Sequence, residues 1–444
     1  MVPDVGWNLT SARWLRHMEH MVRLHDPSVD GDPVALSRKS DDHFQLVRKH
    51  SVRSHACSAP PPFAYSRPNV QRPLATCADL RAGRHEALRG VRLVIGITSA
   101  PDKWGQLRRH GIRQTWMRYP EVGRTTVVCF IVGRSDLKPK ESARLDAEQE
   151  THDDFVFLRH TRDGRGPFVT ITKAHSWFRL ATEMLALVGG RTPSEAEDWS
   201  VLSAEEAHAQ HPRIVLGGSS VAAAGLVASH HVRHIAKADD DTFLQLPELQ
   251  RDLDSLHCHP HLYYGMFAYA GYNSRTFLKC GFDYSSNGGR YRKYGCASPQ
   301  PETEGGVARG RAVAHPPFPF TSGALMLAST PLIVRMATEP AVGEFVARSS
   351  IAHHTDEDVA MGFWISRFHL GGLSPPVQYV EVNRRLANLG CFRHSGLYVA
   401  PRNRSVAAHF VKSAGGMHYV WSILADGMRH NATRCRLMTG DGRL

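Results

Sequence analysis

Three consecutive aspartates, Asp239, Asp240 and Asp241, follow an apolar, strand-like segment and precede Phe243 and Leu244. Neighbouring carboxylates repel one another, and each is costly to bury unless a cation lies close to it. A strand that delivers three of them to its end therefore indicates a bound divalent cation, and oxygen ligands suit Mn²⁺ or Mg²⁺. A solvated turn would also explain the triplet. That explanation is weaker because apolar residues flank the triplet on both sides, with no Gly or Pro adjacent.

Other metal and phosphate motifs do not fit the sequence. An EF-hand loop counted from Asp239 needs Gly at its sixth position and Glu at its twelfth, where this chain has Leu244 and Gln250. The chain also lacks a P-loop, an H-E-x-x-H motif and a G-x-S-x-G elbow. Aspartate-rich strand ends of this kind are typical of enzymes that bind a nucleoside diphosphate through a metal.

Buried-strand runs alternate with helical patterns around the triplet, which predicts an α/β fold with a central mixed, mostly parallel sheet flanked by helices. In such sheets ligands bind at the carboxyl ends of the strands, where Thr98 and the aspartates lie. The predicted strands are 91–99, 125–132, 155–158, 263–267 and 407–411, and the predicted helices are 107–116, 145–151, 169–187, 247–256, 354–368 and, last in the chain, 421–428.

The chain divides into three parts by composition. Residues 1–90 are polar and rich in His and Pro, which predicts a largely disordered stem with one short amphipathic helix at 8–24. Residues 91–430 carry the strand and helix patterns and form the expected catalytic domain, with insertions at about 189–230 and 271–319. Residues 431–444 are the expected C-terminal tail. The second insertion reads as a long loop that a Cys280–Cys296 disulfide could staple.

The net charge of +12 over 444 residues favours anionic partners such as nucleotides. Lys and Arg are scattered, and no basic run is interleaved with aromatic residues, so nucleic acid is not an expected partner. No apolar run reaches the ~18 residues of a membrane helix, and no signal-peptide core is visible. Glycosylation acceptor tripeptides at Asn8, Asn403 and Asn431 point weakly to the secretory route.

Several short motifs occur in an order that carries more information than any one of them. They are Arg108-Arg109, Ile112-Arg113-Gln114-Thr115-Trp116, Phe130-Ile131-Val132-Gly133, Asp153-Asp154-Phe155, Thr172-Lys173, Lys237 with Asp239-Asp240-Asp241, Ser322-Gly323, Glu357-Asp358-Val359 with Gly362, and the segment from His409 to Trp421. This order resembles glycosyltransferase family 31, the β-1,3-galactosyltransferase and β-1,3-N-acetylglucosaminyltransferase group. The resemblance implies a GT-A-type fold and an inverting transfer of a hexose, galactose or N-acetylhexosamine, from a UDP-sugar to a glycan hydroxyl.

The resemblance also implies roles for individual residues. Mn²⁺ would be held by Asp239, Asp241 and His409, while Asp239 and Asp240 would also lie near the ribose or the sugar. Asp358 would be the general base, with Glu357 as the alternate. The remaining donor-binding candidates are Thr98, Arg109, Arg113, Lys173, Ser322 and Gly323.

Two features depart from the family pattern, and two other functions stay open. The turn 320–324 lacks the family's Cys and multi-Gly sequence, which leaves the donor sugar open, and the family's N-terminal membrane anchor is not visible. The resemblance implies the Golgi lumen or membrane. The alternatives are a non-catalytic carbohydrate-binding or scaffold relative and a metal-dependent phosphohydrolase. The cluster His257-Cys258-His259-Pro260-His261 is a weaker candidate for a soft-metal site.

Overall fold

The computed structural model describes residues 56–58, 73–163, 167–185, 231–272, 279–283, 318–352, 356–370, 373–382, 385–391 and 398–439. The predicted helix at 8–24 and the insertion at 189–230 lie outside these residues. None of the described helices is long and apolar enough to cross a membrane.

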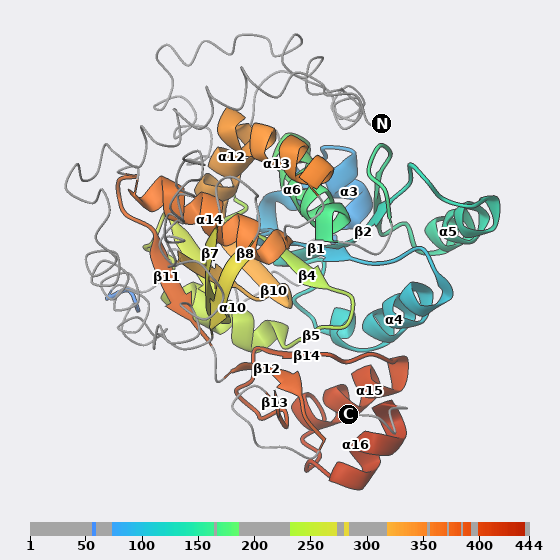
Figure 1. The fold of residues 1–444 in the computed structure, drawn as a ribbon. Helices are drawn as coiled ribbons and strands as arrows, with labels where there is room; N and C mark the ends of the chain where they lie inside the picture. Colours follow the sequence, from blue (N-terminus) through green and yellow to red (C-terminus); the bar gives the residue numbers. More distant parts are fainter. Residues whose placement is uncertain are drawn as a thin grey trace, which may run out of the picture.

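A seven-stranded mixed sheet forms the centre of the molecule (Figure 1), with strand order β11-β6-β10-β4-β1-β2-β3. Neighbouring strands are parallel except β10, which runs antiparallel to both β4 and β6. The prediction of a mixed, mostly parallel sheet flanked by helices is therefore confirmed. The strands are β1 (Leu93–Thr98), β2 (Thr126–Gly133), β3 (Phe155–Leu158), β4 (His234–Asp239), β6 (Leu262–Gly265), β10 (Leu325–Ser329) and β11 (Gln378–Glu381).

Side chains of the central strands alternate between two hydrophobic cores, as the pleat requires. On β4, Ile235 belongs to one core and Ala236 to the other. The first core lies under α3 (Cys77–Arg81), α6 (Pro167–Met184), α12 (Thr330–Thr338), α13 (Pro340–Ala352) and α14 (Glu357–Leu370). Gly96 on β1 lets α6 approach closely, because a Cβ there would lie 2.3 Å from the Trp177 ring.

The second core lies under α4 (Lys103–Gln114), α5 (Pro139–His152) and α10 (Leu246–Ser255). The side chain of Asp102 accepts a hydrogen bond from the amide of Gly105 and so caps the first turn of α4. Because α4, α5 and α10 pack on the second core and α14 on the first, these three helices cover the face of the sheet opposite to α14.

A four-stranded sheet, β13-β12-β14-β5, lies in the lower part of Figure 1 next to the last two helices. The elements are β5 (Phe243–Leu244), β12 (Leu386–Leu389), β13 (Tyr398–Val399), β14 (Ala407–His409), α15 (Ala414–Leu424) and α16 (Ala432–Thr439). The prediction of a last helix at 421–428 was wrong, since α15 ends at Leu424 and α16 follows. The Cys391–Cys435 disulfide holds α16 to the end of β12.

A third sheet, β8-β7-β9, is formed by β7 (Phe267–Tyr272), β8 (Lys279–Asp283) and β9 (Phe318–Thr321). Residues 279–283 were predicted to belong to a long loop, and they form a strand instead. The flanking sequence is rich in Gly and Arg, so no strand was predicted there. The segment forms a strand because it pairs with β7. Residues 284–317, which include Cys296, lie outside the described residues.

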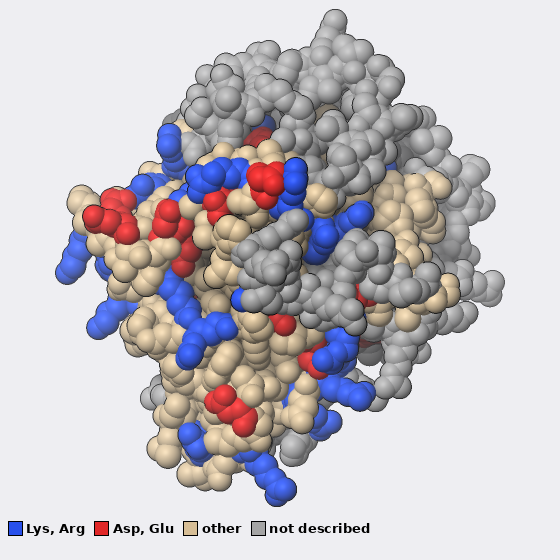
Figure 2. All heavy atoms as spheres, turned by 180° about the vertical axis from the view of Figure 1, so that it is seen from behind, with Lys and Arg blue, Asp and Glu red and all other residues tan. Residues whose placement is uncertain are grey.

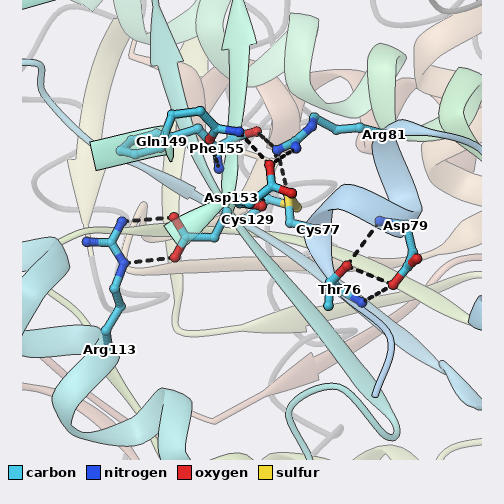
Figure 3. The surroundings of a disulfide bond; sticks show 10 residues. Thr76, Cys77, Asp79, Arg81, Arg113, Cys129, Gln149, Asp153 and Phe155 are labelled. Atoms are coloured by element: carbon cyan, nitrogen blue, oxygen red, sulfur yellow. Dashed lines mark hydrogen bonds and ion pairs between the residues drawn. A yellow bond between two sulfur atoms is a disulfide. The ribbon is translucent and has the colours of Figure 1, made fainter. Parts of the chain in front are cut away.

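Ordered structure begins before residue 91. Helix α3 and the 3₁₀ helix η3 (Ala87–Gly90) precede β1, and Leu80 is buried in the first core. The Cys77–Cys129 disulfide ties α3 to β2. Figure 3 shows Arg81 nearby, where it pairs with the Asp153 carboxylate.

Candidate metal centre

The aspartate triplet lies at the carboxyl end of β4, beside the end of β1. Thr98 pairs in register with Asp239, and its Oγ1 donates to Asp239 Oδ1 at 3.2 Å. Because β10 runs antiparallel to β4, the turn that precedes β10 reaches the same edge of the sheet. The carboxylates therefore lie where ligands bind in open α/β sheets.

Strand β14 brings His409 to this edge from far along the sequence. The chain continues from the triplet into β5, which pairs antiparallel with β14, and the amide of Val411 donates to the Asp241 carbonyl at 2.8 Å. As a result, His409 Nε2 lies 3.3 Å from Asp241 Oδ1 and 3.7 Å from Asp239 Oδ2. The three ligand atoms all lie within 4.8 Å of one another.

This donor set fits a divalent cation. Two carboxylates and one imidazole can bind a divalent cation, and carboxylate oxygens suit Mn²⁺ or Mg²⁺. Asp241 is 5% and His409 9% exposed, while the Asp239 side chain is 30% exposed. Asn388, on neighbouring β12, has its Oδ1 2.9 Å from His409 Nδ1. The amide oxygen can only accept, so Nδ1 carries the proton. Such a partner orients a metal-binding histidine and fixes its tautomer.

Replacing Asn388 by Ala is expected to weaken Mn²⁺ binding by about 10- to 100-fold, the usual effect of removing the hydrogen-bond partner of a metal-binding histidine. Calorimetric titration of Mn²⁺ measures it. Asn388→Asp keeps an acceptor for Nδ1–H and should bind more tightly than Asn388→Ala. Equal affinity of the wild type and Asn388→Ala would show that Asn388 does not support a metal ligand.

Two lysines, the buried Lys237 and the exposed Lys412, pair with the carboxylates in and around the cluster. The Lys237 ammonium pairs with Asp239 and, at 2.9 Å, with Glu357 Oε1. Burial opposes ionisation of Glu357, but the Lys237 charge holds the pKa of its carboxyl below the usual value. Burial likewise opposes ionisation of Asp241, but its contacts with His409 and Lys412 hold the pKa of that carboxyl well below its usual range. Both groups are therefore anionic, and Asp241 is suited to bind a cation.

Asp240 points to other partners. Its carboxylate accepts from Arg108 at 2.9 Å and from the Ser99 hydroxyl at 2.7 Å. The structure thus gives the middle aspartate, predicted to lie near the donor, a role in joining β4 to α4.

The three basic residues predicted to contact the donor are instead paired with carboxylates. Arg109 is fully buried and donates to both oxygens of Glu148, at 2.8 and 2.7 Å. Arg113 binds Asp154 in the same two-pronged manner, both bonds 2.8 Å long. The Lys173 ammonium binds Asp163 at 2.8 Å. These contacts join α4 to α5 and β3, and α6 to the segment after β3, so we assign the three residues no direct contact with a ligand.

The turn between β9 and β10 contains Ser322 and Gly323, which were predicted to bind the donor, and it brings Gly323 beside the cluster. The amide of Ser322 donates to the Met266 carbonyl at 2.8 Å. A Cβ on Gly323 would lie 3.2 Å from Asp239 Oδ2 and 3.3 Å from Glu357 Oε1. The turn therefore approaches the cluster at a point where a larger residue would crowd the Asp239 and Glu357 carboxylates.

Glu357 and Asp358 begin α14, which packs closely on β9. A Cβ on Gly362 would lie 2.3 Å from the Phe320 Cβ, so the glycine permits this contact. The contact places Glu357 beside Lys237 and Asp239. Asp358 lies on the side of Tyr263, where its charge adds to the effect of burial in raising the pKa of that phenol.

The cluster 257–261 does not supply a soft-metal site in the structure. Cys258 forms a disulfide with Cys57, which removes its thiolate. His257 Nδ1 contacts the Asp254 carbonyl at 2.8 Å, and His261 Nδ1 contacts the Pro375 carbonyl.

Comparison with known proteins gives no assignment. No protein-family model matches the chain, and no curated protein matches it. The fold and the Asp239, Asp241 and His409 cluster by themselves define an α/β protein with a candidate metal centre.

The sequence analysis assigned no role in the metal centre to Lys237, Lys412 or Asn388. Lys412 lies three residues after His409, so proximity to a suspected ligand could have suggested it. Nothing in the local sequence around Asn388 pointed to the site, because only the pairing of β12 with β14 brings it there.

Proposed function

We propose that the chain is a metal-dependent inverting glycosyltransferase that moves a hexose, galactose or N-acetylhexosamine, from a UDP-sugar to a glycan hydroxyl with a β-1,3 linkage. The grouping of Asp239, Asp241 and His409 at the carboxyl edge of the sheet is the observation that carries this proposal. The order of the sequence motifs, which resembles glycosyltransferase family 31, supports the choice of donor and linkage.

The chain has residues suited to bind the departing diphosphate and to take the proton of the acceptor hydroxyl. A divalent cation, Mn²⁺ or Mg²⁺, held by the cluster would offset the negative charge of the diphosphate. Asp358 would take the proton of the acceptor hydroxyl as its oxygen attacks the anomeric carbon. The bond from that carbon to the diphosphate oxygen breaks, and UDP leaves with the bonding electrons. Glu357 is the poorer base, because its pairing with Lys237 lowers its pKa.

We place the protein in the Golgi lumen, at or near the membrane. Disulfides persist in oxidising compartments such as the secretory route, and three link described residues: Cys57–Cys258, Cys77–Cys129 and Cys391–Cys435. Two of the glycosylation acceptors, Asn403 and Asn431, are exposed. We do not propose nucleic acid as a partner. Figure 2 shows Lys and Arg interspersed with Asp and Glu on the described part of one face, without a continuous basic surface.

Titration of the wild-type protein with UDP, in Mn²⁺ and in EDTA, tests the proposal. We expect micromolar binding in Mn²⁺ that disappears in EDTA, followed by release of UDP when the correct donor and acceptor are supplied. Metal-dependent UDP binding without transfer to any acceptor tested would favour the non-catalytic carbohydrate-binding alternative. Absence of UDP binding in both conditions would refute a nucleotide-sugar site.

A further inference from the structure

A hollow lies in the C-terminal part of the molecule. Its walls are the turn from Arg402 to Ser405, which precedes β14, and the connection from Gly427 to His430, which joins α15 to α16. Its volume is about 770 Å³, within the ~300–1,000 Å³ typical of ligand sites. The hollow is therefore large enough for a small part of an oligosaccharide.

The lining of the hollow is cationic. It contains four arginines and one histidine but no aspartate or glutamate: Arg385, Arg402, Arg404, Arg429 and His430. Arg385 is paired with Asp252, at 2.6 Å, and with Glu248. Among the described residues, no carboxylate pairs with the guanidinium groups of the other three arginines. These three exposed groups concentrate positive charge over one concave surface.

Hydrogen bonds hold both walls in place. The turn closes through Ser405 N to the Arg402 carbonyl at 2.7 Å, and Arg385 Nε donates to the Arg404 carbonyl at 2.8 Å. On the opposite wall, Tyr419 Oη contacts His430 Nδ1 and donates to the Asn431 carbonyl at 3.0 Å. A ligand would therefore meet a largely preformed surface, which reduces the entropy cost of binding.

We propose that this hollow binds the sulfate or carboxylate group of an acidic glycan. Planar guanidinium groups bind such oxyanions through paired hydrogen bonds, and Pro401, Ile423 and Met428 supply apolar contacts for a sugar ring. Ser405, on the wall, lies four residues before His409 of the metal centre, and β14 begins two residues after Ser405. Even a fully extended chain at about 3.3 Å per residue would separate them by at most roughly 13 Å, which one short oligosaccharide can span. That this glycan is the acceptor rests on the proposed function; the binding itself does not.

The test is calorimetric titration with a heparin hexasaccharide and its desulfated counterpart, in EDTA and at physiological salt. The protein is first freed of N-glycans, because the acceptor Asn403 itself lines the hollow. The variant Arg402→Ala/Arg404→Ala/Arg429→Ala is compared with Lys103→Ala/Arg118→Ala/Lys140→Ala. The second triple removes the same charge elsewhere, at exposed side chains that form no ion pair with the described residues.

We expect the first triple to bind the sulfated probe at least about tenfold more weakly than the wild type, since even one lost charge-assisted hydrogen bond has that effect. The control triple and Asp241→Asn should bind like the wild type, which separates this site from the metal centre. Equal losses in both triples, unchanged binding in the first, or equally tight binding of an oligonucleotide of the same charge would each overturn the proposal. Melting curves establish that all variants are folded.

Discussion

Asp241→Asn is expected to weaken Mn²⁺ binding by about 100-fold or more and to abolish the Mn²⁺-dependent binding of UDP. Removing one protein ligand should have at least the effect of removing a supporting hydrogen bond, and Asp241 is the carboxylate closest to His409 Nε2, at 3.3 Å. The substitution keeps the shape of the side chain, so the strand end should stay intact. Calorimetric titration with Mn²⁺ alone, and with UDP in Mn²⁺, measures both effects.

The neighbouring substitution Asp240→Asn is the matched control. Its carboxylate contacts Arg108 and Ser99 and no member of the cluster. We expect it to leave Mn²⁺ affinity within a few-fold of the wild type and to lower the free energy of unfolding by about 1–3 kcal/mol. If Asp240→Asn lost Mn²⁺ while Asp241→Asn kept it, our assignment of the metal ligands would be wrong.

Asp358→Asn is expected to lower the transfer rate by about 10²- to 10⁴-fold, the contribution of a positioned general base. The binding of UDP in Mn²⁺ should stay near that of the wild type, because Asp358 lies on the side of Tyr263 and is not a member of the metal cluster. The measurement combines UDP release in the presence of donor and acceptor with a calorimetric titration of UDP.

The substitution Glu357→Gln tests whether Asp358 or Glu357 is the general base. Glu357 pairs with Lys237, which is 1% exposed, so the substitution leaves the buried ammonium with Asp239 as its remaining carboxylate. We expect its main effect on the free energy of unfolding, up to about 3–5 kcal/mol, read from denaturant unfolding. A stable Glu357→Gln variant without transfer, together with an active Asp358→Asn variant, would make Glu357 the base. Loss of both UDP binding and transfer in Asp358→Asn would refute a role confined to proton transfer.

Features that depend on local pattern could be predicted from the sequence alone. Alternating strand and helix signals predicted the central sheet, and an apolar strand ending in three carboxylates placed Asp239 and Asp241 at its edge. Hydrophobic periodicity reports which residues are buried, so it locates strands, although their ends shift by one or two residues, as at 263–267 against Leu262–Gly265. It also predicted a strand around His409, which the structure places at 407–409.

Which of these residues come into contact depends on how the strands pair in the folded chain. His409 reaches Asp241 because β14 pairs with β5, more than 160 residues earlier in the chain. Asn388 reaches His409, 21 residues later in the chain, through the pairing of β12 with β14. Arg109 and Arg113 could equally well have faced a diphosphate. Their partners, Glu148 and Asp154, lie on a different helix and beside a different strand. Strand pairing across long sequence separations and the choice of partner for a buried charge depend on the packed fold, which no local pattern encodes.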